Sequence, residues 1–82
     1  MIEEVKATLL EKLGDAEVEI QVNGNSYMLQ IVAFAFDGLN ALKRQQLVYA
    51  CINDKIKSGE MHAVTMRLFS PSEWEKQQKY SL

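Results

Sequence analysis

Very few side chains in this sequence have the types and spacing that catalysis or metal binding requires. The chain has one histidine, His62, and one cysteine, Cys51. A neutral imidazole can complete the coordination of a metal or cluster that a partner presents, whereas a Cys–His pair catalyses nucleophilic reactions only within hydrogen-bonding distance. Cys51 falls on the apolar side of an expected helix, where cysteine acts as a small buried hydrophobe. His62 is therefore the one candidate ligand, and a structural role on an apolar strand face is its alternative.

The sequence also lacks the motifs of the common enzyme classes. No glycine cluster follows an expected strand, so phosphate-loop and dinucleotide signatures are absent, and one cysteine with one histidine cannot form a closed zinc site. A domain of 82 residues buries only about three-fifths of its unfolded surface, which leaves little room for an enclosed pocket. These features predict a single domain over residues 1–82 that binds partners, has no catalytic activity and holds no cofactor by itself.

Charge and cysteine content restrict the compartment and the partners. The formal net charge is -2, which argues against binding to nucleic acid mainly through phosphate contacts. A mild basic bias between Asp37 and Lys57 is the local exception. One cysteine cannot form an internal disulfide, and no stretch resembles a signal peptide or a membrane span. The sequence therefore predicts a cytoplasmic protein that does not bind membranes.

Apolar periodicity predicts the first three elements. Apolar residues recur at helical spacing from Ile2 to Leu13, and Gly14 follows, which indicates a helix over residues 2–13. Strict alternation over residues 18–22 predicts a strand, and Asn23-Gly24 is a strong hairpin signal. The returning strand is apolar on both faces by residue 32, which predicts a central position in the sheet.

The middle of the chain predicts a long helix. Phe36-Asp37-Gly38 ends the second strand, a short helical turn is expected around Leu39-Asn40, and Ser58-Gly59 ends the long helix. The apolar stripe expected on this helix consists of Leu42, Val48, Cys51, Ile52 and Ile56.

A third strand and a final helix complete the chain. Alternation from residue 61 onward places His62 on the more apolar face and Met61 on the opposite face. Ser70 and Glu73 have the spacing of a capping box, and Pro71 suits the first position of a helix.

The order of elements predicts the architecture. It runs helix, strand, strand, one or two helices, strand, helix. The crossover through the long helix should place the third strand parallel to a strand of the hairpin. We therefore expect an α+β fold with a three-stranded mixed sheet and the helices packed on one face.

Five motifs occur in a specific order along the chain. They are Phe36-Asp37-Gly38, Lys43-Arg44-Gln45-Gln46, Val48-Tyr49, Met61-His62-Ala63-Val64 and Ser70-Pro71-Ser72-Glu73-Trp74. With these motifs the chain resembles the BolA family, and within it the acid-stress-linked IbaG (YrbA) branch, from Val18 to about Lys79. The resemblance implies a class II KH-like fold with the order α-β-β-α(α)-β-α.

The resemblance also implies a partner and a cofactor. Members of this family pair with monothiol glutaredoxins, which supply a cysteine and glutathione to a shared [2Fe-2S] cluster, and the histidine matching His62 supplies a further ligand. Such complexes act in iron-sulfur homeostasis and in stress response. The candidate residues for binding the partner are Ser26, Tyr27, His62 and Trp74.

One departure from the family affects the expected ligands. Many relatives carry a second His or Cys ligand after the first strand, where this chain reads Asn23-Gly24-Asn25-Ser26-Tyr27, without thiolate or imidazole. Two alternatives follow. In the first, His62 is the only cluster ligand from this chain, and glutathione, water or the partner fills the remaining position. In the second, the chain binds glutaredoxin without a cluster.

The resemblance implies DNA-binding transcriptional regulation as the alternative function. A KH module clamps the nucleic-acid backbone with a Gly-x-x-Gly loop, and Gly38-Leu39-Asn40-Ala41 retains only the first glycine. Trp74 is expected to pack its helix on the sheet, with partner contact as the alternative. The free chain is expected to be a monomer or a weak homodimer. The candidate residues for nucleic-acid binding are Gly38, Lys43, Arg44 and Lys57.

Overall fold

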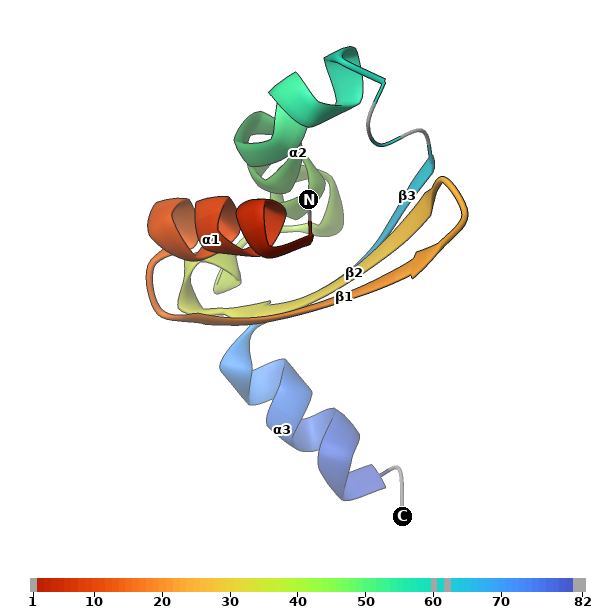
Figure 1. The fold of residues 1–82 in the computed structure, drawn as a ribbon. Coiled ribbons are helices and arrows are strands. Elements are labelled where there is room, and N and C mark those ends of the chain that lie inside the picture. Colours follow the sequence, from red (N-terminus) through yellow and green to blue (C-terminus); the bar gives the residue numbers. More distant parts are fainter. Residues whose placement is uncertain (1, 60, 62, 81–82) are drawn as a thin grey trace.

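The computed structural model describes residues 2–59, 61 and 63–80, and His62 lies outside the described residues. These described residues form three α-helices, three strands and one short 3-10 helix (Figure 1). In chain order these are α1 (Ile2–Leu13), β1 (Ala16–Asn23), β2 (Ser26–Ala33), η1 (Phe34–Phe36), α2 (Ala41–Lys57), β3 (Ala63–Phe69) and α3 (Pro71–Tyr80). The expected α+β order is confirmed.

The sheet has the order β1-β2-β3, with β2 at its centre as predicted. β1 and β2 are antiparallel, and the pairing of Asn23 with Ser26 leaves Gly24 and Asn25 as a two-residue loop. Gly24 has a φ of 62°, and among the described residues only glycines have a positive φ, a pattern that fits a type II′ turn. β3 pairs in parallel with β2, starting with Ser26 beside Ala63. The expected mixed sheet is therefore present.

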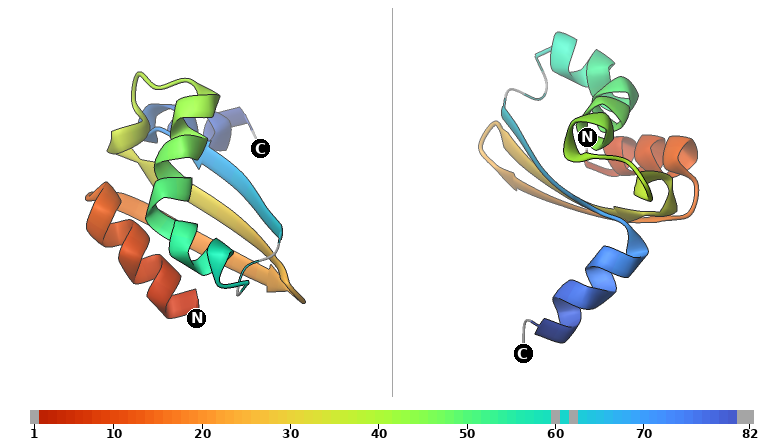
Figure 2. Two further views of the ribbon diagram at one scale, coloured as in Figure 1. Left: turned by 90° about the horizontal axis from the view of Figure 1, so that it is seen from above. Right: turned by 180° about the vertical axis from the view of Figure 1, so that it is seen from behind.

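The helices lie on both faces of the sheet. α1 and α2 cover one face, and α3 leaves from the end of β3 on the opposite side (Figures 1 and 2). The expectation that all helices cover one face was wrong for α3. Successive side chains of a strand alternate between faces, so Phe69 lies on the face opposite to Leu68. Its ring contacts that of Trp74, with 5.3 Å between the centroids, and this contact holds α3 to the second face.

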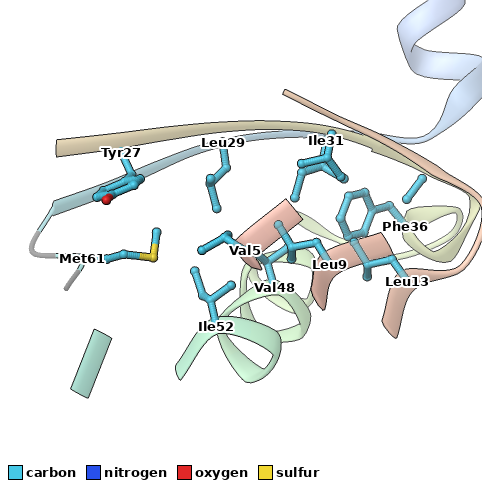
Figure 3. Close-up of a cluster of buried hydrophobic side chains, with 12 residues drawn as sticks. Val5, Leu9, Leu13, Tyr27, Leu29, Ile31, Phe36, Val48, Ile52 and Met61 are labelled. Carbon is cyan, nitrogen blue, oxygen red and sulfur yellow. The ribbon is translucent and has the colours of Figure 1, made fainter. Parts of the chain in front are cut away.

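The core lies between the sheet and the two helices that cover it (Figure 3). Met61 belongs to this core and is 1% exposed, although alternation predicted it on the opposite face. The strand pattern does not apply to Met61, because β3 begins only at Ala63. The core consists of Val5, Leu9, Leu13, Val18, Tyr27, Leu29, Ile31, Ala33, Phe36, Val48, Ile52 and Met61.

Two further expectations about the middle of the chain were wrong. Leu42 is 62% exposed, because six residues at about 100° each place it about 120° around α2 from the buried Val48. The short helical turn is η1, before Gly38, and not at Leu39-Asn40. It starts directly after β2 because Phe36 turns into the core, where it is fully buried.

Candidate functional site

The tip of the hairpin and the start of β3 lie side by side. Ser26 pairs with Ala63, and the amide of Ala63 donates to the carbonyl oxygen of Asn25 over 3.4 Å. Met61 points into the core beside the ring of Tyr27 (Figure 3), and its amide donates to the carbonyl oxygen of Lys55 over 3.4 Å. The structure thus brings the predicted partner residues Ser26 and Tyr27 next to both sequence neighbours of His62.

The two predicted residues at this end differ in exposure. Ser26 is exposed, whereas Tyr27 is only 9% exposed and contributes its ring to the core. Ser26 can therefore contact a partner directly. Tyr27 instead packs beside Met61 inside the domain.

The position of Cys51 in α2 disfavours a role as a cluster ligand. Its side chain is half-buried, and its thiol donates to the carbonyl oxygen of Leu47 over 3.3 Å. Burial raises the pKa of the Cys51 thiol above its usual value, so the thiolate that binds iron is disfavoured. The described residues contain no group of three or more His, Cys, Asp and Glu side chains placed to hold a metal ion.

Trp74 lies at the other end of β3 from the hairpin tip. Its indole packs on Phe69, the last residue of that strand. A strand rises about 3.3 Å per residue, so the backbone positions of Ala63 and Phe69 are about 20 Å apart. The structure therefore confirms the packing role expected for Trp74 and does not bring it together with Ser26 and Tyr27.

The candidate nucleic-acid residues do not form one basic patch. Lys43 and Lys57 are exposed near opposite ends of α2. At 1.5 Å per residue along a helix, their backbones are about 21 Å apart. Gly38 lies in the turn before α2, with a φ of 78°, and the side chain of Asn40 caps the helix by accepting from the amide of Lys43 over 2.9 Å.

Arg44 has structural contacts that the sequence did not predict. Its guanidinium forms a two-point ion pair with Glu73, at 2.6 Å from Nη1 to Oε1 and 3.1 Å from Nη2 to Oε2. It also donates to the carbonyl oxygens of Leu39 (2.9 Å) and Leu68 (3.2 Å). The Arg44 side chain is only 11% exposed. Arg44 therefore joins the start of α2 to the end of β3 and the start of α3.

The start of α3 depends on the same carboxylate. Glu73 accepts from the amide of Ser70 over 2.9 Å, and the amide of Glu73 donates to the hydroxyl of Ser70 over 3.4 Å. This is the capping box expected from the sequence. The hydrogen bond from Arg44, followed by that from the Ser70 amide, lowers the pKa of Glu73 from 4.5 to about 2.

This shift predicts a specific acid sensitivity. A carboxylate with a lowered pKa in the folded state adds stability above its unfolded pKa, and this stability is lost as the pH falls through the folded pKa. We expect the wild-type chain to lose stability between about pH 4.5 and pH 2 faster than Glu73→Gln does. Urea denaturation at a series of pH values measures both free energies of unfolding. A difference between the two proteins that stays constant across this range would contradict the assignment.

The order of elements and the parallel third strand define a small α+β domain with a three-stranded mixed sheet. A family model described as BolA-like protein matches residues 8–73. The chain belongs to the BolA family. An uncharacterised protein of Acinetobacter guillouiae, from the rpoN-murA intergenic region, is 40% identical over 74 residues, covering 90% of this chain and 89% of that protein.

Two further matches are a named acid stress protein and a solved structure. The acid stress protein IbaG of Escherichia coli K12 is 30% identical over 76 residues, covering 93% of this chain and 90% of that protein. The solved structure of BolA1 from Arabidopsis thaliana matches with a TM-score of 0.78 and 26% identity, covering 87% of this chain and 92% of that one. Within the described residues no helix has the length and apolar character that a membrane span requires.

Proposed function

We propose that this protein is a non-catalytic adaptor that binds a monothiol glutaredoxin and helps to hold or deliver a [2Fe-2S] cluster. It acts in the cytoplasm, in iron-sulfur and redox homeostasis and in stress response. The observation that carries the proposal is the joined hairpin tip and β3 start, which fixes both sequence neighbours of His62 in a chain of the BolA family. The similarity to an acid stress protein supports the role in stress.

The side chains available in this protein determine how many cluster ligands it can supply and how many must come from the glutaredoxin. The residues at the hairpin tip, Asn23–Tyr27, include no thiolate or imidazole, and Cys51 is held in α2 by its hydrogen bond to Leu47. This chain would then contribute a single ligand, the imidazole of His62. Cysteine and glutathione from the glutaredoxin side would supply the other ligands, since iron-sulfur clusters favour thiolates.

Anaerobic co-purification with the monothiol glutaredoxin of the same organism tests the proposal. We expect the wild-type pair to be coloured, to contain iron and sulfide in equal amounts, and to lose its absorption and circular dichroism pattern in His62→Ala. His62→Cys restores a soft ligand and should recover a cluster with a changed spectrum. Asn25→Ala alters the hairpin tip without removing a cluster ligand, and serves as the control.

The outcomes separate the alternatives left by the sequence. A colourless heterodimer with wild-type protein would mean that the chain binds glutaredoxin without a cluster. No heterodimer at all would contradict the adaptor function. A coloured complex with the same spectrum in His62→Ala would mean that the cluster has no ligand at His62.

DNA-binding regulation is the less supported alternative. Of the three basic side chains predicted to contact nucleic acid, Arg44 is engaged with Glu73 and two carbonyl oxygens, and the two exposed lysines lie near opposite ends of α2. Protein binding releases counterions from the nucleic acid, and this makes the affinity depend on the salt concentration. A mobility shift that disappears in Lys43→Ala/Lys57→Ala and weakens with salt would favour this alternative over the adaptor.

A further inference from the structure

The outer edge of β1 has unpaired backbone groups. Among the described strands β1 pairs only with β2. A two-residue hairpin loop is closed by a hydrogen-bonded pair, and such pairs alternate with non-bonded ones along an antiparallel ladder. Counting from the closing pair of Asn23 and Ser26, alternate residues of β1 direct their N–H and C=O groups away from β2. These outward residues are Ala16, Val18, Ile20 and Val22.

A groove runs along this edge, beneath α1. Seen from above, α1 lies on the outer side of β1, beyond the edge of the sheet (Figure 2, left). Two hollows of about 400 and about 380 Å³ lie along the edge of β1 and share Lys6, Val18 and Glu19 in their walls. The larger one extends around the edge to Gln30, Val32 and Trp74 on the opposite face of the sheet. Ile2 lines one hollow and Leu10 the other. The hollows therefore form one continuous groove beside the unpaired backbone groups.

The two sides of the groove differ in chemistry. The side facing α1 is mostly apolar, although Lys6 of α1 also lines it. Ile2, a large hydrophobic residue at this side, is 41% exposed. The apolar lining residues are Ile2, Leu10, Val18 and Ile20. On the opposite side of the sheet the exposed carboxylates of Glu17 and Glu19 project from the same strand. Trp74 lines the groove on that side, and an indole face attracts cations.

We propose that β1 accepts an extended segment of a partner protein in which apolar and basic residues alternate. The segment adds a strand to the sheet through the outward N–H and C=O groups of β1. Because side chains alternate between the faces of a strand, its apolar side chains enter the groove under α1. Its Lys and Arg side chains reach Glu17, Glu19 and Trp74.

The position of α1 disfavours a second copy of this chain as the occupant. Pairing of β1 with β1 of a second copy would follow a two-fold axis at this edge. Each α1 lies beyond the edge of its own sheet (Figure 2, left), so the two helices would meet in the same space. A single extended segment lies in the plane of the sheet and passes beneath α1.

A short blocked peptide that alternates lysine and valine is the probe. We expect its addition to protect the amides of Ala16, Val18, Ile20 and Val22 from hydrogen exchange and to shift their NMR signals. Glu17→Gln/Glu19→Gln should weaken binding about tenfold, since each exposed charge contact contributes up to about 1 kcal/mol. Both substitutions keep side-chain size and lie on exposed positions, so the fold is retained.

Matched controls isolate charge and backbone pairing. Asp37→Asn/Asp54→Asn makes the same change in net charge at exposed positions away from β1 and should leave the affinity unchanged. A peptide with glutamate in place of lysine, and one N-methylated at the amides that face β1, should both fail to bind.

Other results would overturn the proposal. Equal weakening by both double variants would mean that only net charge matters. Protection of β3 amides in place of β1 amides would place the added strand at the other edge. A free chain that is dimeric by light scattering, with the β1 amides already protected, would identify a second copy as the occupant.

Discussion

Phe36→Ala is expected to lower the free energy of unfolding by about 3–5 kcal/mol, the usual cost of removing a buried aromatic ring. Phe36 is fully buried in the core and turns inward directly after β2. The guanidinium of Arg44 lies 6.0 Å from the centre of its ring. The substitution therefore creates a cavity and removes the surface on which Arg44 packs. Small domains have only about 5–15 kcal/mol of stability, so much of it should be lost in urea denaturation.

Phe34→Ala is the matched control, because Phe34 belongs to the same short helix, η1, but is 62% exposed. Surface substitutions usually change stability by less than about 0.5 kcal/mol. Equal costs for the two substitutions would contradict the burial of Phe36 in the core.

Arg44→Ala is expected to cost about 2–3 kcal/mol. Removing one partner of a buried ion pair costs about 3–5 kcal/mol, and the partial exposure of Glu73 reduces this figure. The loss has two parts. The carbonyl oxygens of Leu39 and Leu68 lose a donor, and α3 loses its ionic link to α2. Urea denaturation gives the free energy, and amide exchange in residues 70–74 reports the loosening of α3.

Two variants at and beside this position test the geometry of the contact. Lys43→Ala removes the neighbouring exposed charge and should be nearly neutral, although it also lies in the first turn of α2. Arg44→Lys keeps the charge but cannot form the two-point contact with a carboxylate, so most of the loss should remain. Full recovery of stability in Arg44→Lys would mean that charge alone, without the planar fork, holds the three elements together.

Local patterns predicted most of the fold. The bounds of α1 followed from apolar spacing ended by Gly14, and the start of α3 followed from Ser70, Pro71 and Glu73. These features depend on neighbours within one turn of helix or one hairpin, so sequence alone determines them. Errors arose where tertiary contacts decide. Leu42 was assigned to the apolar stripe although the rotation of α2 places it outside the core.

The candidate site was predicted only in part. Motif order indicated His62 and its neighbourhood, and the structure brings Ser26 beside Ala63 as strand pairing requires. The contact of Arg44 with Glu73 joins residues far apart in the chain, and nothing in the local sequence distinguishes Arg44 from the exposed Lys43 next to it. The separation of Trp74 from the hairpin tip depends on the length and direction of β3, which the motif order does not encode.

The two strands that flank β2 in the sheet differ in their distance along the sequence, and this difference affects the folding kinetics. β1 directly precedes β2 in the chain, whereas β3 follows only after α2. The β1–β2 hairpin needs only a two-residue loop, and hairpins of this kind form within microseconds. β3 can join only after the chain has passed through η1 and α2, and closing a longer loop costs more entropy. We therefore expect docking of β3 to be the slow step of folding, and until it occurs the central strand carries an open edge that can pair with other chains.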